Sequence, residues 1–410
     1  MKTINCRICG DEAKKTFVNL GKTPLSNSYL KTSMFKREKR IPLHALICEK
    51  CFLVQLGEFQ SPKQIFSEYA YFSSYSESWL KHAEEYAKKM KMRFSLNSKN
   101  LVVEIASNDG YLLQYFKRYK IPVLGIEPAL NVAKIAKKRK IPTITKFFGT
   151  KLARELTNSG KQADLLLGNN VLAHVPKLND FVNGLKILLK PEGVITLEFP
   201  HLMKLIKNNQ FDTIYHEHFS YFSLITLIKL FSSHGLKIFD VEKLSTHGGS
   251  LRIFVKHKEN KFLKERQSVK DLLKEEENFG LKKIVTYTSF SSKAETVKEK
   301  LREFLINAKK SNKIVVGYGA PAKGNTLLNY CEIDSKLIKY TVDRNPHKQG
   351  LYLPGSHIPI KSPEEIFRTK PDYVLILPWN LKKEIIFQMK NIRDWGGKFV
   401  VPIPEVKIIK

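Results

Sequence analysis

Residues 211–223 contain an unusual concentration of side chains that can carry protons. Apolar and aromatic residues flank five titratable groups within seven positions, namely Tyr215, His216, Glu217, His218 and Tyr221. Burial and mutual interaction shift pKa values, and histidine is the side chain best suited to proton transfer near neutral pH. We therefore predict acid–base catalysis by this segment. A mononuclear metal site completed by His174 and His201, or a structural helix with hydrogen-bonded histidines, are the alternatives.

Four of the five cysteines form two close pairs. Cys6 and Cys9 are separated by two residues, and so are Cys48 and Cys51. Each pair can present two thiolates from a tight turn, and two such turns complete a tetrahedral zinc site. Four thiolates leave no open coordination position, so the predicted zinc is structural. A redox dithiol, two disulfides or chance spacing are the alternatives, and Cys331 is expected simply to pack.

A strand, a turn and a helix are predicted in succession over 101–116. The strand at 101–105 is apolar, the turn at 106–110 is rich in small residues, and a helix begins near 111. An amphipathic helix is predicted before them, over 79–95, and a second strand after them, over 123–127. Glu127 ends that strand, where a Rossmann-like unit places an acid that binds ribose hydroxyls.

The turn favours S-adenosylmethionine over a dinucleotide as the ligand. It does not read G-x-G-x-x-G, because Gly110 is its only glycine. A pyrophosphate needs the close backbone approach that glycines permit, and S-adenosylmethionine has no pyrophosphate. A unit that binds nothing is the remaining alternative. The candidate residues for binding the donor are Glu104, Ala106, Asn108, Gly110, Glu127, Pro128, Asn169 and Asn170.

Further strands at 164–168 and 193–199 alternate with helices around 148–158 and 178–189. This alternation predicts a doubly wound parallel sheet, which binds ligands at the carboxyl ends of its strands. Asn169, Asn170 and His174 follow one such end, and His201 follows the next.

A second strand–turn–helix unit is predicted near the C-terminus. A strand at 313–317 precedes a glycine-rich turn at 317–324 and a helix from 326, and the next strand, 338–343, ends in an acid. A long helix over 293–310 connects this unit to the rest of the chain. A second NAD-like site and a site for a phosphate or sugar are both consistent with this unit.

The composition is that of a globular protein. Of the 410 residues, 42% are hydrophobic and 27% are charged, and no apolar run is long enough to cross a membrane. The N-terminus lacks the apolar core of a signal peptide, so we expect a cytoplasmic protein. The net charge of +31 could indicate a polyanionic partner, but the lysines are dispersed, and the densest clusters, 36–40 and 137–140, are short.

Several long stretches make the chain resemble the deoxysugar C-methyltransferases, which build branched-chain sugars. The resemblance runs in order from residue 6 to about 360 and is carried by CRICG, LGKTPLSNSYL, CEKCFLVQL, YFSSYSESWLKHA, VVEIASNDGYLLQYF, GIEPALNVA, GNNVLAHVP, FDTIYHEHFSYFS, THGGSLR, GYGAPAKGNTLLN and VDRNPHKQGLYLPGSHIPI. It implies an α/β protein in three regions: a zinc-binding domain (1–72), a class I methyltransferase domain (73–285) and a C-terminal Rossmann-like domain that binds the nucleotide sugar (286–410).

The resemblance also implies an activity, which is methylation of a carbon next to the ketone of a nucleotide-linked 4-keto-deoxysugar. The sugar is expected to be thymidine diphosphate-linked and the target to be carbon 3, with carbon 5 as the alternative. The implied base is His218, with Glu217 orienting it or replacing it, while Tyr215 binds the ketone oxygen and His174 is a second candidate for proton transfer.

The implied substrate contacts are Tyr71, Tyr75, His201, His247, Tyr318, Lys323, Asn325, Asp343, Arg344 and Lys348. A nucleic-acid methyltransferase with a zinc module would also explain the charge and the cysteines. It would not explain the C-terminal unit or the cluster at 215–221, so a nucleic-acid partner is not expected. A sugar-nucleotide-binding protein without catalytic activity is disfavoured by that intact cluster.

Overall fold

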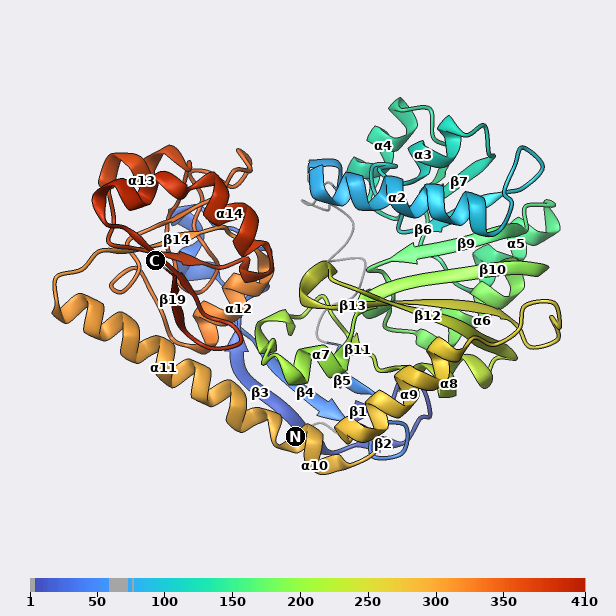
Figure 1. Cartoon of the computed structure of the whole chain (residues 1–410), viewed down its shortest axis with the longest axis horizontal. Coiled ribbons are helices and arrows are strands. Elements are labelled where there is room, and N and C mark those ends of the chain that lie inside the picture. Colours follow the sequence, from blue (N-terminus) through green and yellow to red (C-terminus); the bar gives the residue numbers. More distant parts are fainter. Residues whose placement is uncertain (1–3, 59–72, 76, 410) are drawn as a thin grey trace.

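A computed structural model describes residues 4–58, 73–75 and 77–409. Its central feature is a seven-stranded sheet, and Figure 1 shows this sheet with helices on both faces. In sheet order the strands are β12 (Leu236–Leu244), β13 (Ser250–His257), β10 (Leu189–Pro200), β9 (Ala163–Asn169), β6 (Val102–Ile105), β7 (Val123–Ile126) and β8 (Thr143–Ile144).

The sheet is mixed, whereas we predicted a parallel one. The strands from β10 to β8 are parallel, but β13 is antiparallel to β10 and β12 is antiparallel to β13. The connection from β12 to β13 is short, and only an antiparallel pair can be joined without a long crossover. All residues of β6 and β7 are buried, as expected for strands that are covered on both faces.

Helices cover the two faces of this sheet through two separate hydrophobic clusters. One cluster joins α2, α3 and α4 to one face, and the other joins α5, α6, α8 and α9 to the opposite face. The helices are α2 (Glu77–Arg93), α3 (Leu113–Arg118), α4 (Leu130–Lys138), α5 (Thr150–Asn158), α6 (Leu178–Leu188), α7 (Leu202–Lys207), α8 (Leu224–Ser232) and α9 (Gln267–Phe279).

The N-terminal region forms its own antiparallel structure. A small hairpin precedes a four-stranded sheet in the order β11-β5-β4-β3, and β11 is the last part of the predicted catalytic cluster at 215–221. The strands are β1 (Ile4–Asn5), β2 (Glu12–Ala13), β3 (Lys15–Thr23), β4 (Ile41–Ile47), β5 (Val54–Leu56) and β11 (Ser220–Tyr221). The catalytic segment is therefore tied to the N-terminal region.

The C-terminal region contains a third sheet, in the order β16-β15-β14-β17-β18-β19. All its pairs are parallel except β18 with β19. The elements are β14 (Val315–Tyr318), α12 (Ala322–Tyr330), β15 (Thr341–Val342), β16 (Ile360–Lys361), α13 (Glu364–Thr369), β17 (Tyr373–Ile376), α14 (Lys382–Gln388), β18 (Lys398–Val401) and β19 (Lys407–Ile409).

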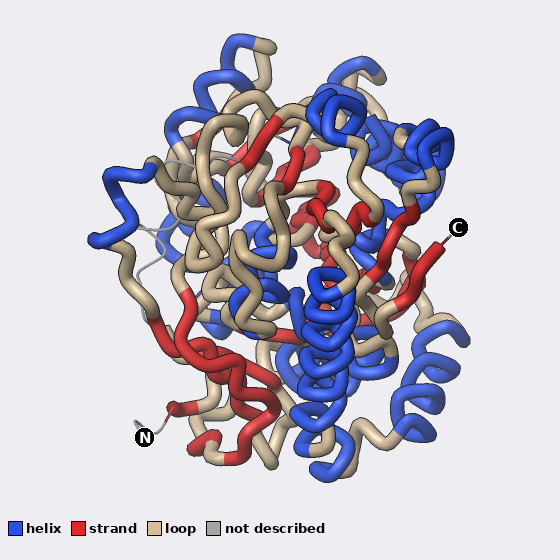
Figure 2. Tube along the Cα trace, turned by 90° about the vertical axis from the view of Figure 1, so that its left-hand side faces the viewer, coloured by secondary structure: helices blue, strands red, loops and turns tan. Residues whose placement is uncertain are grey.

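Two helices, α10 (Ile284–Thr288) and α11 (Phe290–Lys310), connect the seven-stranded sheet to the C-terminal region. The predicted connecting helix is confirmed as α11, which packs along β3 and faces the viewer in the side view (Figure 2). The ring of Phe290 stacks on that of Phe17 with centroids 4.6 Å apart, so the helix also fastens the N-terminal sheet. No helix within the described ranges is long and apolar enough to cross a membrane.

Candidate active site

A cavity of about 860 Å³ lies at the carboxyl ends of β6, β7 and β9. All three regions line it, because Asn27 comes from the N-terminal region, while Lys323 and Lys348 come from the C-terminal region. The volume lies within the usual range of small-molecule sites.

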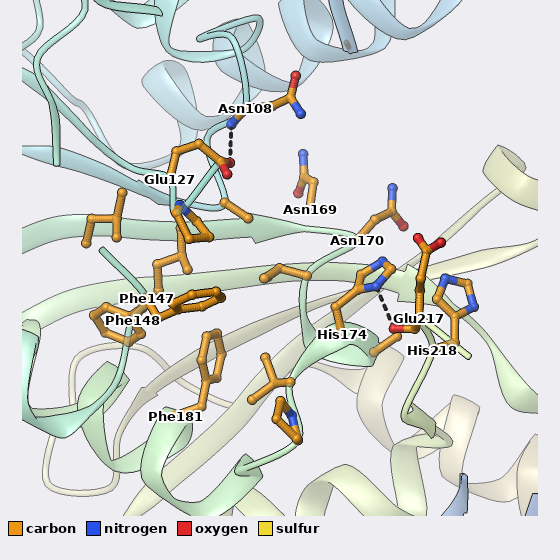
Figure 3. Close-up of a pocket in the computed structure, with 18 of the residues that line it drawn as sticks. Asn108, Glu127, Phe147, Phe148, Asn169, Asn170, His174, Phe181, Glu217 and His218 are labelled. Atoms are coloured by element: carbon orange, nitrogen blue, oxygen red, sulfur yellow. Dashed lines mark hydrogen bonds between the residues drawn. The ribbon is translucent and has the colours of Figure 1, made fainter. Parts of the chain in front are cut away.

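One end of the cavity is formed by the loop after β6. Ala106 and Asn108 adopt positive φ angles of 55° and 48°, which turns the backbone sharply at the strand end. The Asn108 N–H donates to Glu127 Oε2 at 2.9 Å, and the Ala129 N–H donates to Oε1 at 2.8 Å (Figure 3). Burial raises the pKa of Glu127, while these two hydrogen bonds lower it. The carboxyl group is thus held rigidly beside the loop.

Asn169 and Asn170 form the adjacent edge of the cavity, at the end of β9. Both amide atoms of Asn169 are buried and have no hydrogen-bond partner among the described residues. Unpaired buried amides are costly, so their presence indicates a polar ligand at this position. Asn170 has a φ of 54°, and its Nδ2 atom lies 3.2 Å from His247 Nε2. This edge fits a methyl donor with an amino-acid and a ribose portion.

Six of the eight predicted donor-binding residues line this cavity, and two do not. Glu104 is 1% exposed and lies behind the loop, where burial and then Glu127 and Asp109 raise its pKa well above the ordinary value. Gly110 has a φ of 78°, and a Cβ atom there would lie 2.4 Å from Ile141 Cδ1. Glu104 and Gly110 therefore support the conformation of the loop and do not face the cavity.

The predicted catalytic segment, residues 211–223, lies at the other end of the cavity. It consists of a short 3-10 helix, η4 (Phe211–Thr213), a loop and β11, so the alternative of a regular helix is wrong. The Phe219 N–H donates to the Ala173 carbonyl at 2.7 Å, and the Leu56 N–H donates to the Phe219 carbonyl at 2.9 Å. These bonds fix the loop between η3 (Leu172–His174), which follows β9, and the N-terminal sheet.

Hydrogen bonds define the tautomer of His218. Its Nδ1 lies 3.0 Å from the Thr213 carbonyl, which can only accept, so Nδ1 carries the proton. Its Nε2 then accepts from the Tyr215 hydroxyl at 2.7 Å. Burial, with further lowering by His174, holds the pKa of His218 well below its ordinary value, so the ring is neutral. We expected Glu217 to orient this ring; Thr213 does so instead.

His174 and Glu217 complete this end of the cavity (Figure 3). His174, in η3 (Leu172–His174), donates from Nδ1 to the Glu217 backbone carbonyl at 2.7 Å, and burial lowers its pKa to about 4. Burial raises the pKa of the Glu217 carboxyl to about 7, against a hydrogen bond from Asn27 that lowers it. Glu217 is thus poised between its two charge states at neutral pH.

Lys323, Lys348 and His247 are the predicted substrate contacts that line the cavity. Lys323 Nζ donates to Asn380 Oδ1 at 2.9 Å and lies over the Trp379 ring, and burial lowers its pKa. Lys348 Nζ donates to the Ala320 carbonyl at 2.8 Å. Two cationic groups therefore approach the cavity from the C-terminal region.

The structure does not place five of the predicted substrate residues on the cavity, and four of them make other contacts. His201 is buried against Glu276 at 2.7 Å, and the Tyr318 hydroxyl donates to Gln388 at 3.2 Å. The remaining three are Asn325, which binds the Ser26 carbonyl, Asp343, which accepts from the Ala320 N–H, and Arg344, which is exposed.

Two tyrosines cannot be assigned to the cavity in the same way. Tyr71 lies outside the described residues, and Tyr75 is described only as the last residue of η2 (Ser73–Tyr75). Their predicted contact with the sugar stays a prediction.

Several cavity residues were not among the sequence predictions. Three aromatic side chains, Phe147, Phe148 and Phe181, lie around the donor end (Figure 3). Asn27 lies at the catalytic end, within the LGKTPLSNSYL stretch of the sequence. That stretch contributed to the resemblance, but nothing in its local pattern indicates which of its polar residues reaches the cavity.

The four paired cysteines meet in space. Their sulfur atoms all lie within 4.8 Å of one another, with Cys6 to Cys51 at 3.3 Å and Cys9 to Cys48 at 3.5 Å. Zinc–sulfur bonds of about 2.3 Å would place sulfurs ~3.8 Å apart, so the group fits a tetrahedral Zn²⁺.

The two cysteine turns have the same backbone geometry. In each, the residue four positions after the first cysteine donates its N–H to that cysteine's carbonyl at 2.9 Å and has a positive φ, 76° at Gly10 and 61° at Phe52. The four thiolates leave no position for a substrate, so the zinc is structural.

Comparison with known proteins agrees with this architecture. Residues 6–66 match a family model described as a putative zinc binding domain, 79–241 match a methyltransferase domain, and 245–404 match a C-methyltransferase C-terminal domain. The fold and the site therefore define an S-adenosylmethionine-dependent methyltransferase with a zinc-binding N-terminal region.

A relative of similar length shows the family. The chain is 38% identical over 405 residues to the C-methyltransferase NovU of Streptomyces niveus, which covers 98% of this chain and 96% of that one. The chain belongs to this C-methyltransferase family and is a C-methyltransferase. It is also 30% identical over 97 residues, 23% of this chain, to 38% of the ubiquinone biosynthesis O-methyltransferase of Bartonella tribocorum. The solved PH0226 protein of Pyrococcus horikoshii is 16% identical, with a TM-score of 0.38 over 48% of this chain and 99% of that one.

Proposed function

We propose that this enzyme methylates carbon 3 of a nucleoside diphosphate-linked 4-keto-deoxysugar, with thymidine diphosphate as the nucleotide. The observation that carries the proposal is the pair formed by His218 Nε2 and the Tyr215 hydroxyl, 2.7 Å apart in the cavity that also contains the donor edge. In the proposed substrate, the ketone oxygen accepts a hydrogen bond and the neighbouring carbon carries the acidic hydrogen. The spacing of these two groups is comparable to that of the Tyr215 hydroxyl and His218 Nε2. The pair therefore matches both groups at once.

In the proposed mechanism, His218 is the base. Its Nδ1 stays bound to the Thr213 carbonyl, so the lone pair of Nε2 is available to take the proton from carbon 3. The Tyr215 hydroxyl turns its hydrogen bond from Nε2 to the ketone oxygen and stabilises the charge that develops on the enolate. S-adenosylmethionine would supply the methyl group: a bond from carbon 3 to the methyl carbon would form as the bond from that carbon to the sulfonium sulfur breaks, and S-adenosylhomocysteine would leave as a neutral thioether.

Glu217 and His174 have supporting roles in this proposal. Glu217, with a pKa of about 7, is the alternative base. His174 is neutral at pH 7, because burial lowers its pKa to about 4, and its Nδ1 is engaged by the Glu217 carbonyl. It packs against His218 with ring centroids 4.8 Å apart and restricts the position of the base.

The donor and the nucleotide are proposed to bind at opposite sides of this pair. Glu127, Asn108 and Asn169 would hold the donor, since they line the edge that the strand ends form. Lys323 and Lys348 would hold the diphosphate, because a dianion compensates for cations that border a buried cavity. His247 would contact the sugar, as it lies between Asn170 and the Trp79 ring, 5.3 Å away.

Substitution of the two candidate bases tests the mechanism. We expect His218→Ala to lower kcat at least ~10²-fold, the usual contribution of a general base, with little change in donor affinity. The matched variants are His218→Asn and Glu217→Gln, and kcat with a thymidine diphosphate 4-keto-sugar is the measurement. A near-wild-type rate for His218→Ala would exclude this role for His218. An inactive Glu217→Gln beside an active His218→Asn would assign the base to Glu217.

A further inference from the structure

Asn27 makes a contact that links the N-terminal region to the catalytic segment. Its Nδ2 donates to Glu217 Oε1 at 2.6 Å. Glu217 is 5% exposed. Among the described residues, only the Asn27 side chain donates a hydrogen bond to the Glu217 carboxyl group. Both residues line the cavity. A buried carboxyl group with a single fixed partner has its orientation set by that partner.

The position of Asn27 is itself fixed by the C-terminal region. Asn325 Nδ2 donates to the Ser26 carbonyl at 2.6 Å, just before Asn27, and Asn325 is 1% exposed. After Asn27, the Tyr29 hydroxyl donates to the Ala320 carbonyl at 2.5 Å. Two backbone hydrogen bonds of 3.0 and 2.9 Å then pair Leu30 with Tyr352. The segment 26–30 is therefore held on both sides of Asn27.

The same part of the C-terminal region also holds the catalytic segment directly. Thr326 Oγ1 donates to the Ile214 carbonyl at 3.1 Å, and it lies 3.4 Å from Ser26 Oγ. The start of α12 thus contacts both the segment that carries Asn27 and the loop that carries Glu217. This arrangement sets the relative position of the two partners.

We propose that Asn27 is a positioning residue of the active site, which holds the Glu217 carboxyl toward the sugar and couples all three regions to catalysis. The inference rests on the proposed function, since it takes Glu217 to act on the acceptor. In this proposal, Asn325 affects catalysis because it fixes the position of Asn27, and not because it contacts the substrate.

The charge on Glu217 responds to this contact. Tyr29 of the 26–30 segment interacts electrostatically with Glu217. The other titratable groups that line the cavity are Glu58, Tyr111, Glu127, Lys146, Lys151, His174, Lys177, Asp180, Tyr215, His218, His247, Lys323 and Lys348. Burial raises the pKa of Glu217 to about 7, and the hydrogen bond from Asn27 opposes that rise because it stabilises the carboxylate. Removing Asn27 therefore raises the pKa further.

The test measures Glu217 directly in the full-length, zinc-loaded protein. Titration of ¹³C-carboxyl-labelled glutamate by NMR, with Glu217→Gln to identify the resonance, gives its pKa. We expect Asn27→Ala to raise this pKa by about one unit, because a hydrogen bond to the charged form is lost. We expect kcat to fall at least ~10-fold while the Kd of S-adenosylmethionine stays within about twofold, since Asn27 lies at the catalytic end.

Three further variants make the test specific. Ser28→Ala is the matched control, because Ser28 is exposed next to Asn27, and it should leave the pKa and kcat unchanged. Asn27→Asp keeps the size but replaces the donor with a carboxyl group, so it should raise the Glu217 pKa more than Asn27→Ala does. Asn325→Ala should change the pKa in the same direction as Asn27→Ala and by less.

An unchanged Glu217 pKa in both Asn27 variants would overturn the inference, and so would an Asn27→Ala enzyme with wild-type kcat. The titration needs no sugar. A wild-type enzyme that fails to methylate 4-keto-sugars would therefore contradict the proposed function without affecting this result.

Discussion

Burial sets the charge of the residues at the catalytic end of the cavity. His174, His218 and His247 have lowered pKa values, primarily because desolvation penalises the imidazolium. The same desolvation raises the pKa of Glu217. At neutral pH the site therefore contains three neutral imidazoles and a carboxyl group near its midpoint. A neutral imidazole has the lone pair that a base needs, which is consistent with the role proposed for His218.

The Glu217 pKa predicts how stability depends on pH. A carboxyl group raised from 4.5 to about 7 binds its proton more tightly in the folded state. Its contribution is fully present below about pH 4.5 and is lost as the pH rises through 7. Glu217→Gln keeps the neutral form at every pH. We therefore expect this variant to be more stable than wild type at pH 8.5, by up to about 3 kcal/mol, and equally stable at pH 4.5.

Urea unfolding of both proteins at the two pH values checks this expectation. Glu259→Gln is the control, because Glu259 is exposed and should show no such difference. Equal stability of Glu217→Gln and wild type at pH 8.5 would mean that the carboxyl group is not held in a desolvated state.

Among the elements, local sequence patterns predicted those that form the proposed donor edge of the cavity. The apolar strand at 101–105, the tight turn and the following helix are visible because their patterns are contiguous, and β6 and α3 match them. The cysteine pairs were readable for the same reason. In contrast, β11 has two residues and exists because β5 pairs with it, so no local pattern identifies it.

The predicted substrate residues that the structure places away from the cavity make long-range contacts. His201 looked available because it follows a strand end, yet Glu276 on α9 binds it. Asn325 looked like a substrate contact because it follows a glycine-rich turn, yet it binds Ser26, which is far away in the sequence. Such pairings depend on how the three regions pack, which periodicity along one segment does not encode.

The pairing of β5 with β11 predicts an effect of zinc on catalysis. The second cysteine turn leads directly into β5, and β5 pairs with the strand that follows His218. We expect Cys48→Ser to lose its bound zinc, to lower Tm by several degrees and to reduce kcat, because structural zinc contributes directly to folding. Metal analysis, thermal unfolding and the methyl-transfer assay measure these three quantities.

Cys331→Ala provides the comparison for this experiment. Cys331 is buried but lies outside the cysteine cluster, so its variant should keep one zinc per chain. Full zinc content and wild-type kcat in Cys48→Ser would contradict the link between the metal site and the catalytic segment.

At the scale of the whole molecule, the active site is shared by three regions. The methyltransferase sheet provides the proposed donor edge, the N-terminal sheet pairs with β11, the loop after β3 supplies Asn27, and the C-terminal region supplies Lys323 and Lys348. This division fits a two-substrate reaction in which the donor and the acceptor enter from different regions.

The central claim is that the enzyme removes a proton next to a sugar ketone and places a methyl group on that carbon. The most direct measurement is incubation of the enzyme in D₂O with thymidine diphosphate 4-keto-6-deoxyglucose, first without and then with S-adenosylmethionine. We expect deuterium to enter carbon 3 in the first case and a methyl group to appear there in the second, and His218→Ala to abolish both. No exchange and no methylation with any 4-keto-sugar nucleotide would contradict the account, and exchange at carbon 5 would contradict the assignment of the carbon.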